Sequence, residues 1–291
     1  MFRIWVEAAR PATLPAAIVP VLVGSGLAAG DGVFRWDVFA AVLVAALAIQ
    51  IGANFANDAS DAKRGADTED RVGPTRAVAT GLVTSRAMWV ATWIAVFVGA
   101  LAAVYLITVA GWIVAVIGVI STVAMLGYVG GPRPYGYRGL GEVFVFLFFG
   151  VVATVGTRYV YDNAAPLDAW LLSIPVGLPV TAILVANNIR DIETDAAAGK
   201  RTLAVILGRD RTRTLFAVLI WGAFASLFVL VIARLVPLAT GIALFWAPWA
   251  APLVRTVATE VDGAKLIGVL KGVGRLHLLM GISMAVGATL G

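Results

Sequence analysis

Apolar stretches of about twenty residues recur along the whole chain, and they constrain its fold more than any other feature. A helix needs about 20 predominantly apolar residues to cross the hydrocarbon core of a bilayer. The chain is 60% hydrophobic and 13% charged, whereas soluble domains carry about 25% charged residues. We therefore expect an all-α, polytopic membrane protein with nine transmembrane helices, forming one integral-membrane domain over residues 1–291. The predicted spans are 11–29, 36–56, 87–107, 109–129, 141–161, 168–188, 213–233, 236–254 and 271–290.

Lysine and arginine residues gather on alternate connections between these spans. Of the 22 basic residues, nineteen fall on one side, and only Arg35, Arg158 and Arg234 fall on the other. Cytoplasmic loops carry an excess of basic residues, so the N-terminus is expected in the cytoplasm and, after nine spans, the C-terminus outside a cell membrane. The net charge of +5 is explained by this topology, and we expect no nucleic-acid partner.

The side chains available for chemistry are few. The chain has no cysteine and a single histidine, His277, which excludes thiolate chemistry and any multi-histidine metal site. The polar segments on the cytoplasmic side are about 57–86, 130–140 and 189–212. Any reaction therefore depends on the carboxylate, amide, tyrosine and basic side chains of these three segments.

Two of these segments carry matched acidic motifs. Asn57 and Asp61 in the first segment are spaced to share one helical face, and Asn187, Asp191 and Asp195 repeat that spacing in the second. Oxygen-only ligands suit hard cations, and magnesium prefers a few carboxylates completed by water and substrate phosphates. The alternative is that the acids only solvate the ends of loops. Two matched motifs on one side favour a magnesium site.

Basic and aromatic residues accompany the motifs. Arg76 follows the first, and Lys200 and Arg201 follow the second, where they could bind the free oxygens of a diphosphate; the alternative is a purely topological role. Residues 128–142 combine tyrosines and arginines with glycine and proline, which indicates a structured turn. Interfacial anchoring is the alternative for these tyrosines.

The three segments resemble the UbiA superfamily of intramembrane prenyltransferases, and in particular its branch that acts on dihydroxynaphthoate. The strings that carry the resemblance are NDASDAKRGADTEDRVGPTR at 57–76, YVGGPRPYGYRGLGE at 128–142 and NNIRDIETDAAAGKRTLAVILG at 187–208. The resemblance implies a magnesium-dependent enzyme of menaquinone biosynthesis. Such an enzyme transfers a polyprenyl group from polyprenyl diphosphate to 1,4-dihydroxy-2-naphthoate, with loss of CO2 and diphosphate, and gives demethylmenaquinol.

The resemblance also assigns roles to residues. Asp61, Asp191 and Asp195 would be catalytic. The superfamily has a further aspartate where this chain has Gly65, and Asp67 lies two residues later. The implied metal ligands are Asn57, Asp61, Asn187, Asp191 and Asp195; the implied diphosphate-binding residues are Arg76, Arg133, Lys200 and Arg201; and Tyr128 and Tyr137 would stabilise a prenyl cation or position the acceptor ring.

Two other functions remain open at this point. One is a prenyltransferase of the same superfamily with a different acceptor, such as 4-hydroxybenzoate, homogentisate, haem or a sugar phosphate. The other is an ion-coupled transporter whose acidic residues mark an ion path. The clustering of the acids on one side argues against transport, because transport needs access from both faces.

Overall fold

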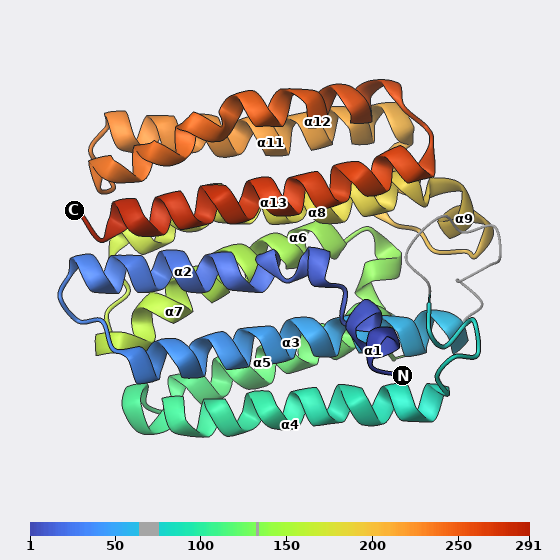
Figure 1. Cartoon of the computed structure of the whole chain (residues 1–291), viewed down its shortest axis with the longest axis horizontal. Coiled ribbons are helices and arrows are strands. Elements are labelled where there is room, and N and C mark those ends of the chain that lie inside the picture. Colours follow the sequence, from blue (N-terminus) through green and yellow to red (C-terminus); the bar gives the residue numbers. More distant parts are fainter. Residues whose placement is uncertain (64–75, 132–133) are drawn as a thin grey trace.

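A computed structural model describes residues 1–63, 76–131 and 134–291, and throughout these residues the regular structure is helical, with no strand. The long helices run roughly antiparallel to one another in a single bundle (Figure 1). The elements are α1 (Phe2–Ala9), η1 (Pro11–Thr13), α2 (Pro15–Gly30), α3 (Trp36–Lys63), α4 (Ser85–Ala110), α5 (Ile113–Val129), η2 (Tyr135–Arg138), α6 (Gly141–Val145), the π-helix η3 (Phe146–Val152), α7 (Ala153–Asp162), α8 (Leu167–Arg190), α9 (Ile192–Ala197), α10 (Leu203–Leu207), α11 (Arg209–Ile232), η4 (Leu238–Trp246), α12 (Ala247–Thr259) and α13 (Gly263–Ala288).

The prediction of an all-helical membrane protein is confirmed, and each predicted span coincides with helical structure. In the described residues seven helical segments are long and apolar enough to cross a bilayer, and an eighth is added if residues 2–13 and α2, bent by 54°, form one span. The remaining predicted span, 109–129, coincides with α5, whose 17 residues are too few for it to be counted with the others. The main difference is the length of α3, which continues to Lys63 and carries the first acidic motif on its last two turns.

Local signals explain where several helices begin and end. The Thr84 side chain accepts a hydrogen bond from the Ala87 amide and so caps α4. Gly111, with φ of 81°, ends α4 and separates it from α5. The Asp262 side chain accepts a hydrogen bond from the Ala264 backbone amide and so caps the start of α13. These caps satisfy backbone groups that a helix end leaves without partners.

The bundle has buried central helices and lipid-facing outer ones. In the most apolar 18-residue stretch of α8, 72% of the residues are buried, whereas in the corresponding stretch of α4 only 17% are buried. Helix α4 leaves Trp93, Phe97 and Leu101 more than half exposed. A large exposed apolar surface is unfavourable in water, so this surface is explained by contact with lipid.

Small residues set the closest helix contacts. Helices α2 and α13 lie side by side along the bundle (Figure 1), and a methyl group added at Gly26 would overlap the Ala285 carbonyl. Likewise, one added at Gly281 would overlap the Val19 side chain. Small residues at membrane helix interfaces allow this close approach.

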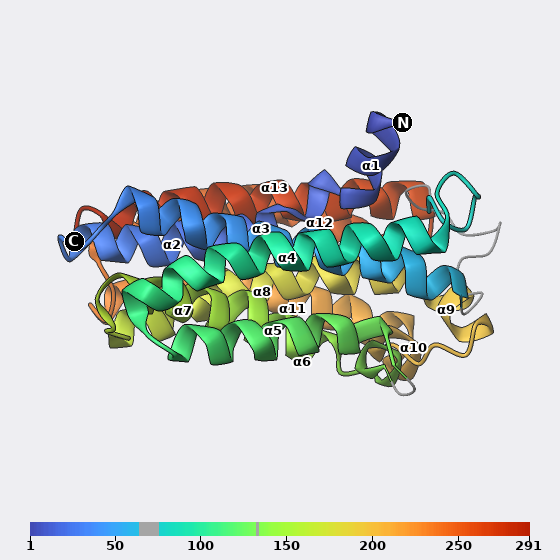
Figure 2. The same cartoon turned by 90° about the horizontal axis from the view of Figure 1, so that it is seen from below.

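One end of the bundle gathers the polar segments. The C-terminal ends of α3 and α8 lie there with α9, and α1 projects from the bundle beside them, whereas the C-terminus lies at the opposite end (Figures 1 and 2). The two acidic motifs are therefore at the same end of the molecule, although 130 residues separate Asp61 from Asp191.

Candidate functional site

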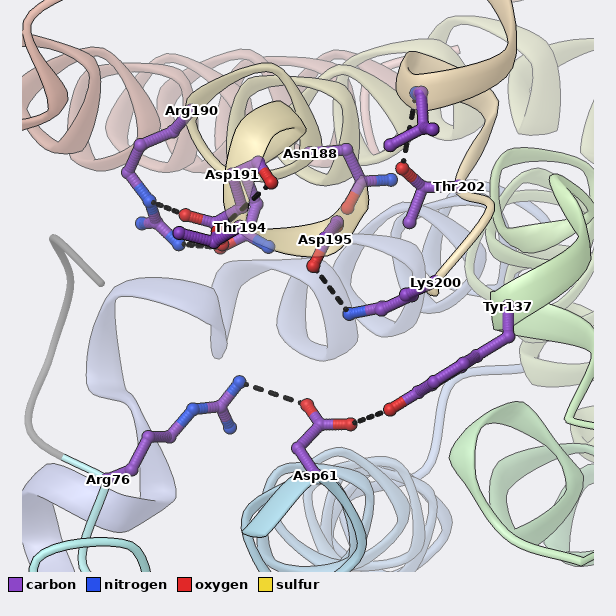
Figure 3. A network of polar contacts seen from close by, with 12 residues as sticks. Asp61, Arg76, Tyr137, Asn188, Arg190, Asp191, Thr194, Asp195, Lys200 and Thr202 are labelled. Carbon is purple, nitrogen blue, oxygen red and sulfur yellow. Dashed lines mark hydrogen bonds and ion pairs between the residues drawn. The ribbon is translucent and has the colours of Figure 1, made fainter. Parts of the chain in front are cut away.

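The acidic motifs occupy two helix ends that face each other. Asp61 lies on the last turns of α3, Asp191 follows the last residue of α8, and Asp195 lies on α9. All three side chains are buried, with 3%, 4% and 5% exposure respectively. In Figure 3, Asp61 points from the α3 end toward Lys200 and Asp195 on the other side of the site. The fold thus brings both predicted motifs into one buried polar site.

Asp61 is held by groups from two other segments. Arg76 forms an ion pair with it, with Nη2 3.3 Å from Oδ2. The Tyr137 hydroxyl donates a hydrogen bond of 2.8 Å to Oδ1. Charge-assisted contacts of this kind are stronger than hydrogen bonds between neutral groups. The orientation of Asp61 is therefore fixed from both sides (Figure 3).

Asp58 has a different role from its neighbour in the motif. Its two oxygens accept hydrogen bonds from the backbone amides of Ala77 and Val78, each at 3.1 Å. Asp58 therefore fastens the chain to α3 directly after Arg76. Asp58 does not line the cavity, and we infer that its hold on the backbone helps to position Arg76.

The second motif contains an ion pair that sequence reasoning missed. The Arg190 guanidinium donates hydrogen bonds of 2.6 and 2.5 Å to the two carboxylate oxygens of Asp191. It donates a third, of 2.9 Å, to the side-chain amide oxygen of Asn187. Arg190 is not among the site residues predicted from the sequence. The signal was available, because Arg190 lies three residues after Asn187 and such residues are neighbours on a helix surface.

Lys200 connects the second motif to Tyr137. Its Nζ lies 3.4 Å from Asp195 Oδ1 and 5.3 Å from the centre of the Tyr137 ring, so it forms both an ion pair and a cation–π contact. Desolvation by burial raises the pKa of Asp195 to about 6, and the Lys200 ammonium limits this rise. The nearby carboxylates of Asp191 and Asp61 contribute smaller parts of this rise. A cation placed between these carboxylates would relieve their repulsion.

A cavity of about 330 Å³ extends from this polar site into the bundle. Asn57, Asp61, Arg76, Asn187 and Lys200 line its polar end. The remainder is mostly apolar and is lined by residues of α2, α3, α4, α5, η3, α7 and α8. The site is therefore a polar head joined to an apolar channel, which is the shape of an amphiphile with a charged head and a long hydrocarbon tail.

The donor atoms fit a divalent cation. Asn57 Oδ1 and Asp195 Oδ2 are buried and have no hydrogen-bond partner among the described residues, and buried oxygens without partners are unfavourable unless a ligand satisfies them. In the described part of the chain no three acidic or histidine side chains are close enough to form a complete metal cluster. This fits magnesium, which usually takes one or two carboxylates and completes its shell with water and phosphate oxygens.

Two of the residues predicted to bind diphosphate or substrate, Arg201 and Tyr137, do not line the cavity. The Arg201 side chain is exposed. The Tyr137 hydroxyl donates a hydrogen bond to Asp61, whereas Tyr135, which the sequence did not single out, lines the cavity. Tyr128 does line the cavity. Its ring packs edge-to-face with the ring of Tyr135, and the two ring centres are 5.4 Å apart. Arg133 lies outside the described residues, as does Asp67.

Further residues of the site were not identified from the sequence. Asn188 donates a hydrogen bond of 2.9 Å to the buried Glu142 and so joins α8 to α6. Arg10, at the bend between α1 and α2, lines the cavity. Neither Glu142 nor Arg10 belongs to a repeated acidic motif, so only the packing of the helices reveals them.

Comparisons with known proteins find a matching family model, similar sequences and similar folds. The model of the UbiA prenyltransferase family matches residues 17–266. The chain is 41% identical to the 1,4-dihydroxy-2-naphthoate octaprenyltransferase of Mycobacterium tuberculosis, over 98% of this chain and 96% of that protein. It is 36% identical to the Escherichia coli K12 protein of the same name, over 89% and 86% of the two chains. The fold is similar to that of a UbiA homolog from Archaeoglobus fulgidus bound to GPP and Mg2+, with a TM-score of 0.64 and 13% identity over 97% and 99% of the chains.

Proposed function

The chain belongs to the UbiA prenyltransferase family, and on this basis we propose that it transfers a polyprenyl group from polyprenyl diphosphate to 1,4-dihydroxy-2-naphthoate. The reaction releases CO2 and diphosphate and gives demethylmenaquinol. The observation that carries the proposal is the buried site in which Asp61 and Asp195 face each other above an apolar channel. The relatives named for the same activity at 41% and 36% identity support the acceptor.

We assign the diphosphate and its magnesium to the polar end of the cavity. Arg76 and Lys200 both line this end, and each is held by a carboxylate, so their cationic groups are positioned before the donor binds. The proposed ligands are drawn from Asn57, Asp61, Asn187, Asp191 and Asp195, of which one or two carboxylates would contact a given magnesium ion while water and phosphate oxygens complete its shell. When bound, magnesium supplies positive charge that stabilises the departing diphosphate.

Arg190 does not prevent Asp191 from acting as a ligand. An ionised carboxylate has about four acceptor positions on its two oxygens, and Arg190 occupies one on each oxygen. The same Arg190 holds the Asn187 oxygen. We propose that Arg190 is a positioning residue that keeps both second-motif ligands in one orientation.

The chain's own residues account for the remaining requirements of the reaction. Arg76 and Lys200 stabilise the negative charge that develops as the bond between the prenyl carbon and the diphosphate oxygen breaks. The aromatic rings of Tyr128 and Tyr135 line the cavity and can stabilise the allylic cation that remains. The acceptor ring attacks this cation at its carboxylated carbon, and loss of CO2 restores aromaticity. No strong base is therefore needed at that carbon.

The apolar channel is the proposed site of the prenyl tail. Its walls come from helices that cross the membrane, so water is excluded from the reactive cation. An ion-coupled transporter, the alternative from a different class, has no support, because the matching family and the similar relatives are prenyltransferases.

The arrangement of the polar site also suggests a topology. We propose that the polar end of this multi-pass membrane protein lies at the cytoplasmic face of the cell membrane, since most of the basic residues are on that side. The N-terminus would then be cytoplasmic and the C-terminus outside. Because both motifs and the channel lie within one bundle, we further propose that residues 1–291 act as a single domain.

The decisive experiment is product analysis with purified protein. The protein is incubated with a polyprenyl diphosphate, magnesium and either 1,4-dihydroxy-2-naphthoate, 4-hydroxybenzoate or homogentisate, and products are identified by mass spectrometry. We expect demethylmenaquinol to dominate, and its formation to stop in excess chelator and resume when magnesium is restored. A dominant product from another acceptor would overturn the naphthoate assignment, and undiminished activity in chelator would overturn the metal assignment.

A further inference from the structure

Two cationic side chains lie on the outer surface of helix α13, away from the cavity. Lys271 and Arg275 are one helical turn apart, and both are exposed. They belong to a helix that is long and apolar enough to cross a bilayer. Charged side chains within such helices usually face the interior of the bundle, so a pair that faces outward marks a functional site.

The packing of α13 fixes the direction in which the two cations point. A methyl group added at Gly272 would overlap a side chain of α12, and one added at Gly274 would overlap a backbone carbonyl of η1, just before α2. Val273 is fully buried between them. Because an α-helix turns by about 100° per residue, Lys271 and Arg275 fall on the side opposite Val273. The pair therefore stands on the outer face of α13, between α12 and α2, which flank this helix in Figure 1.

Neither cation has an acidic partner in the part of the chain that the structure describes. The nearest acidic residues along the chain are Glu260, which pairs with Lys265, and Asp262, which caps the start of α13. Asp262 is nine positions from Lys271, about 13 Å along the helix. Like charges one turn apart repel each other, so an anion bound between the two side chains would stabilise the pair.

The surroundings of the pair have the dimensions of one leaflet of a bilayer. Gly268, about one turn before Lys271 on the same face, is exposed, and a methyl group added there would meet no atom within 4 Å. This leaves room for a lipid headgroup. In the other direction Ile282 and Val286, 43% and 51% exposed, continue the same face. Val286 is eleven positions from Arg275, about 16 Å along the helix, which is close to half of the roughly 30 Å hydrocarbon core.

We propose that Lys271 and Arg275 bind the phosphate of an anionic phospholipid, whose acyl chains lie along the outer face of α13. Side chains on a helix lean toward its N-terminus, which for α13 is the end that carries the polar site (Figure 1). The cations therefore reach toward the headgroups while their stems remain beside the acyl chains. A headgroup with a net negative charge is favoured, because the cationic group of a zwitterionic lipid is repelled by the pair. The preference of basic residues for cytoplasmic loops does not account for a pair on the outer side of a span.

The test measures lipid binding directly and does not depend on the proposed function. Purified wild type and the Lys271→Gln/Arg275→Gln double variant are titrated in detergent with palmitoyl-oleoyl phosphatidylglycerol, palmitoyl-oleoyl phosphatidylcholine or inorganic phosphate. Bound lipid is counted by native mass spectrometry, and thermal unfolding is followed in parallel. We expect the Kd for phosphatidylglycerol to rise about tenfold or more in the double variant. Binding of phosphatidylcholine should stay the same, and inorganic phosphate should stabilise neither protein.

Arg255→Gln is the matched control. Arg255 is an exposed arginine on the neighbouring helix α12, and no second cation lies within one turn of it. We expect this variant to keep the wild-type affinity for phosphatidylglycerol. Gly268→Leu tests the same site without a change in charge, because the added side chain enters the open space above the two cations. It should weaken phosphatidylglycerol binding and leave the fold intact, and so it also serves if the double variant does not fold.

Four outcomes would overturn the proposal. One is an equal affinity for phosphatidylglycerol in wild type and both site variants. Another is an equal loss in Arg255→Gln, because the attraction would then come from the overall charge of the protein. Equal affinity of wild type for the two lipids would contradict the selection of an anionic headgroup. Stabilisation by inorganic phosphate that is lost in the double variant would assign the pair to a soluble anion.

Discussion

The Tyr137 hydroxyl donates a hydrogen bond of 2.8 Å to Asp61 Oδ1, while the ring of Tyr137 lies 5.3 Å from Lys200 Nζ. One side chain therefore contacts a carboxylate of the first motif and a lysine that follows the second. It holds Asp61 by its hydroxyl and Lys200 by its ring. Tyr137 is a positioning residue, since it acts through Asp61 and Lys200.

Tyr137→Phe removes the hydroxyl and keeps the ring. Loss of a hydrogen bond to a charged group costs about 1.5–3 kcal/mol, so we expect the concentration of magnesium needed for half-maximal activity to rise about tenfold or more. The measurement is a magnesium titration of prenyl transfer. Tyr105→Phe is the matched control, because Tyr105 donates to Asp37 in the same way at the opposite end of the bundle. An equal effect of both substitutions would contradict the positioning role.

Asp61→Asn, Asp191→Asn and Asp195→Asn test the proposed ligands directly. Each substitution removes a negative charge and keeps the shape of the side chain, so we expect prenyl transfer to fall by about 100-fold or more while the protein still inserts and folds. Asp210→Asn is the control, since Asp210 is 94% exposed and lies on α11. Near wild-type activity in any two of the three site variants would refute the shared ligand role.

Asp58→Ala should behave differently from the ligand variants. It leaves the Ala77 and Val78 amides without their acceptor, and a buried donor without a partner costs about 1–3 kcal/mol. We expect a lower thermal stability and a higher KM for the donor, because Arg76 is displaced. The magnesium dependence should change less than in Asp61→Asn. An equal loss of magnesium dependence in the two variants would show that Asp58 itself binds the metal.

Gly26→Ala tests the contact between α2 and α13. The added methyl group would overlap the Ala285 backbone carbonyl, and overpacking of this kind typically costs 1–3 kcal/mol. We expect a clearly lower unfolding temperature in detergent. Gly118→Ala is the control, because an added methyl group meets no atom within 4 Å at that helical position. Equal unfolding temperatures for the two variants would contradict the close packing of α2 on α13.

The helical segments could be predicted because they depend on local sequence. Runs of apolar residues marked the spans, and Gly111 marked the break between α4 and α5, because its φ of 81° suits glycine and disfavours other residues. The extension of α3 to Lys63 was harder to predict. Its last turns are polar, and their helical structure depends on burial of Asp58 and Asp61 against other segments.

The sequence by itself determined the class of protein, its spans and the family, which the comparisons confirmed, because hydropathy and short motifs are properties of neighbouring residues. Only the tertiary structure decided which side chains share the site: that Asp58 holds the backbone after Arg76, that Tyr137 contacts Asp61, and that Tyr135 lines the cavity. The physical reason is that these contacts join helices far apart in sequence, and their geometry follows from close packing of the bundle, which no local pattern encodes.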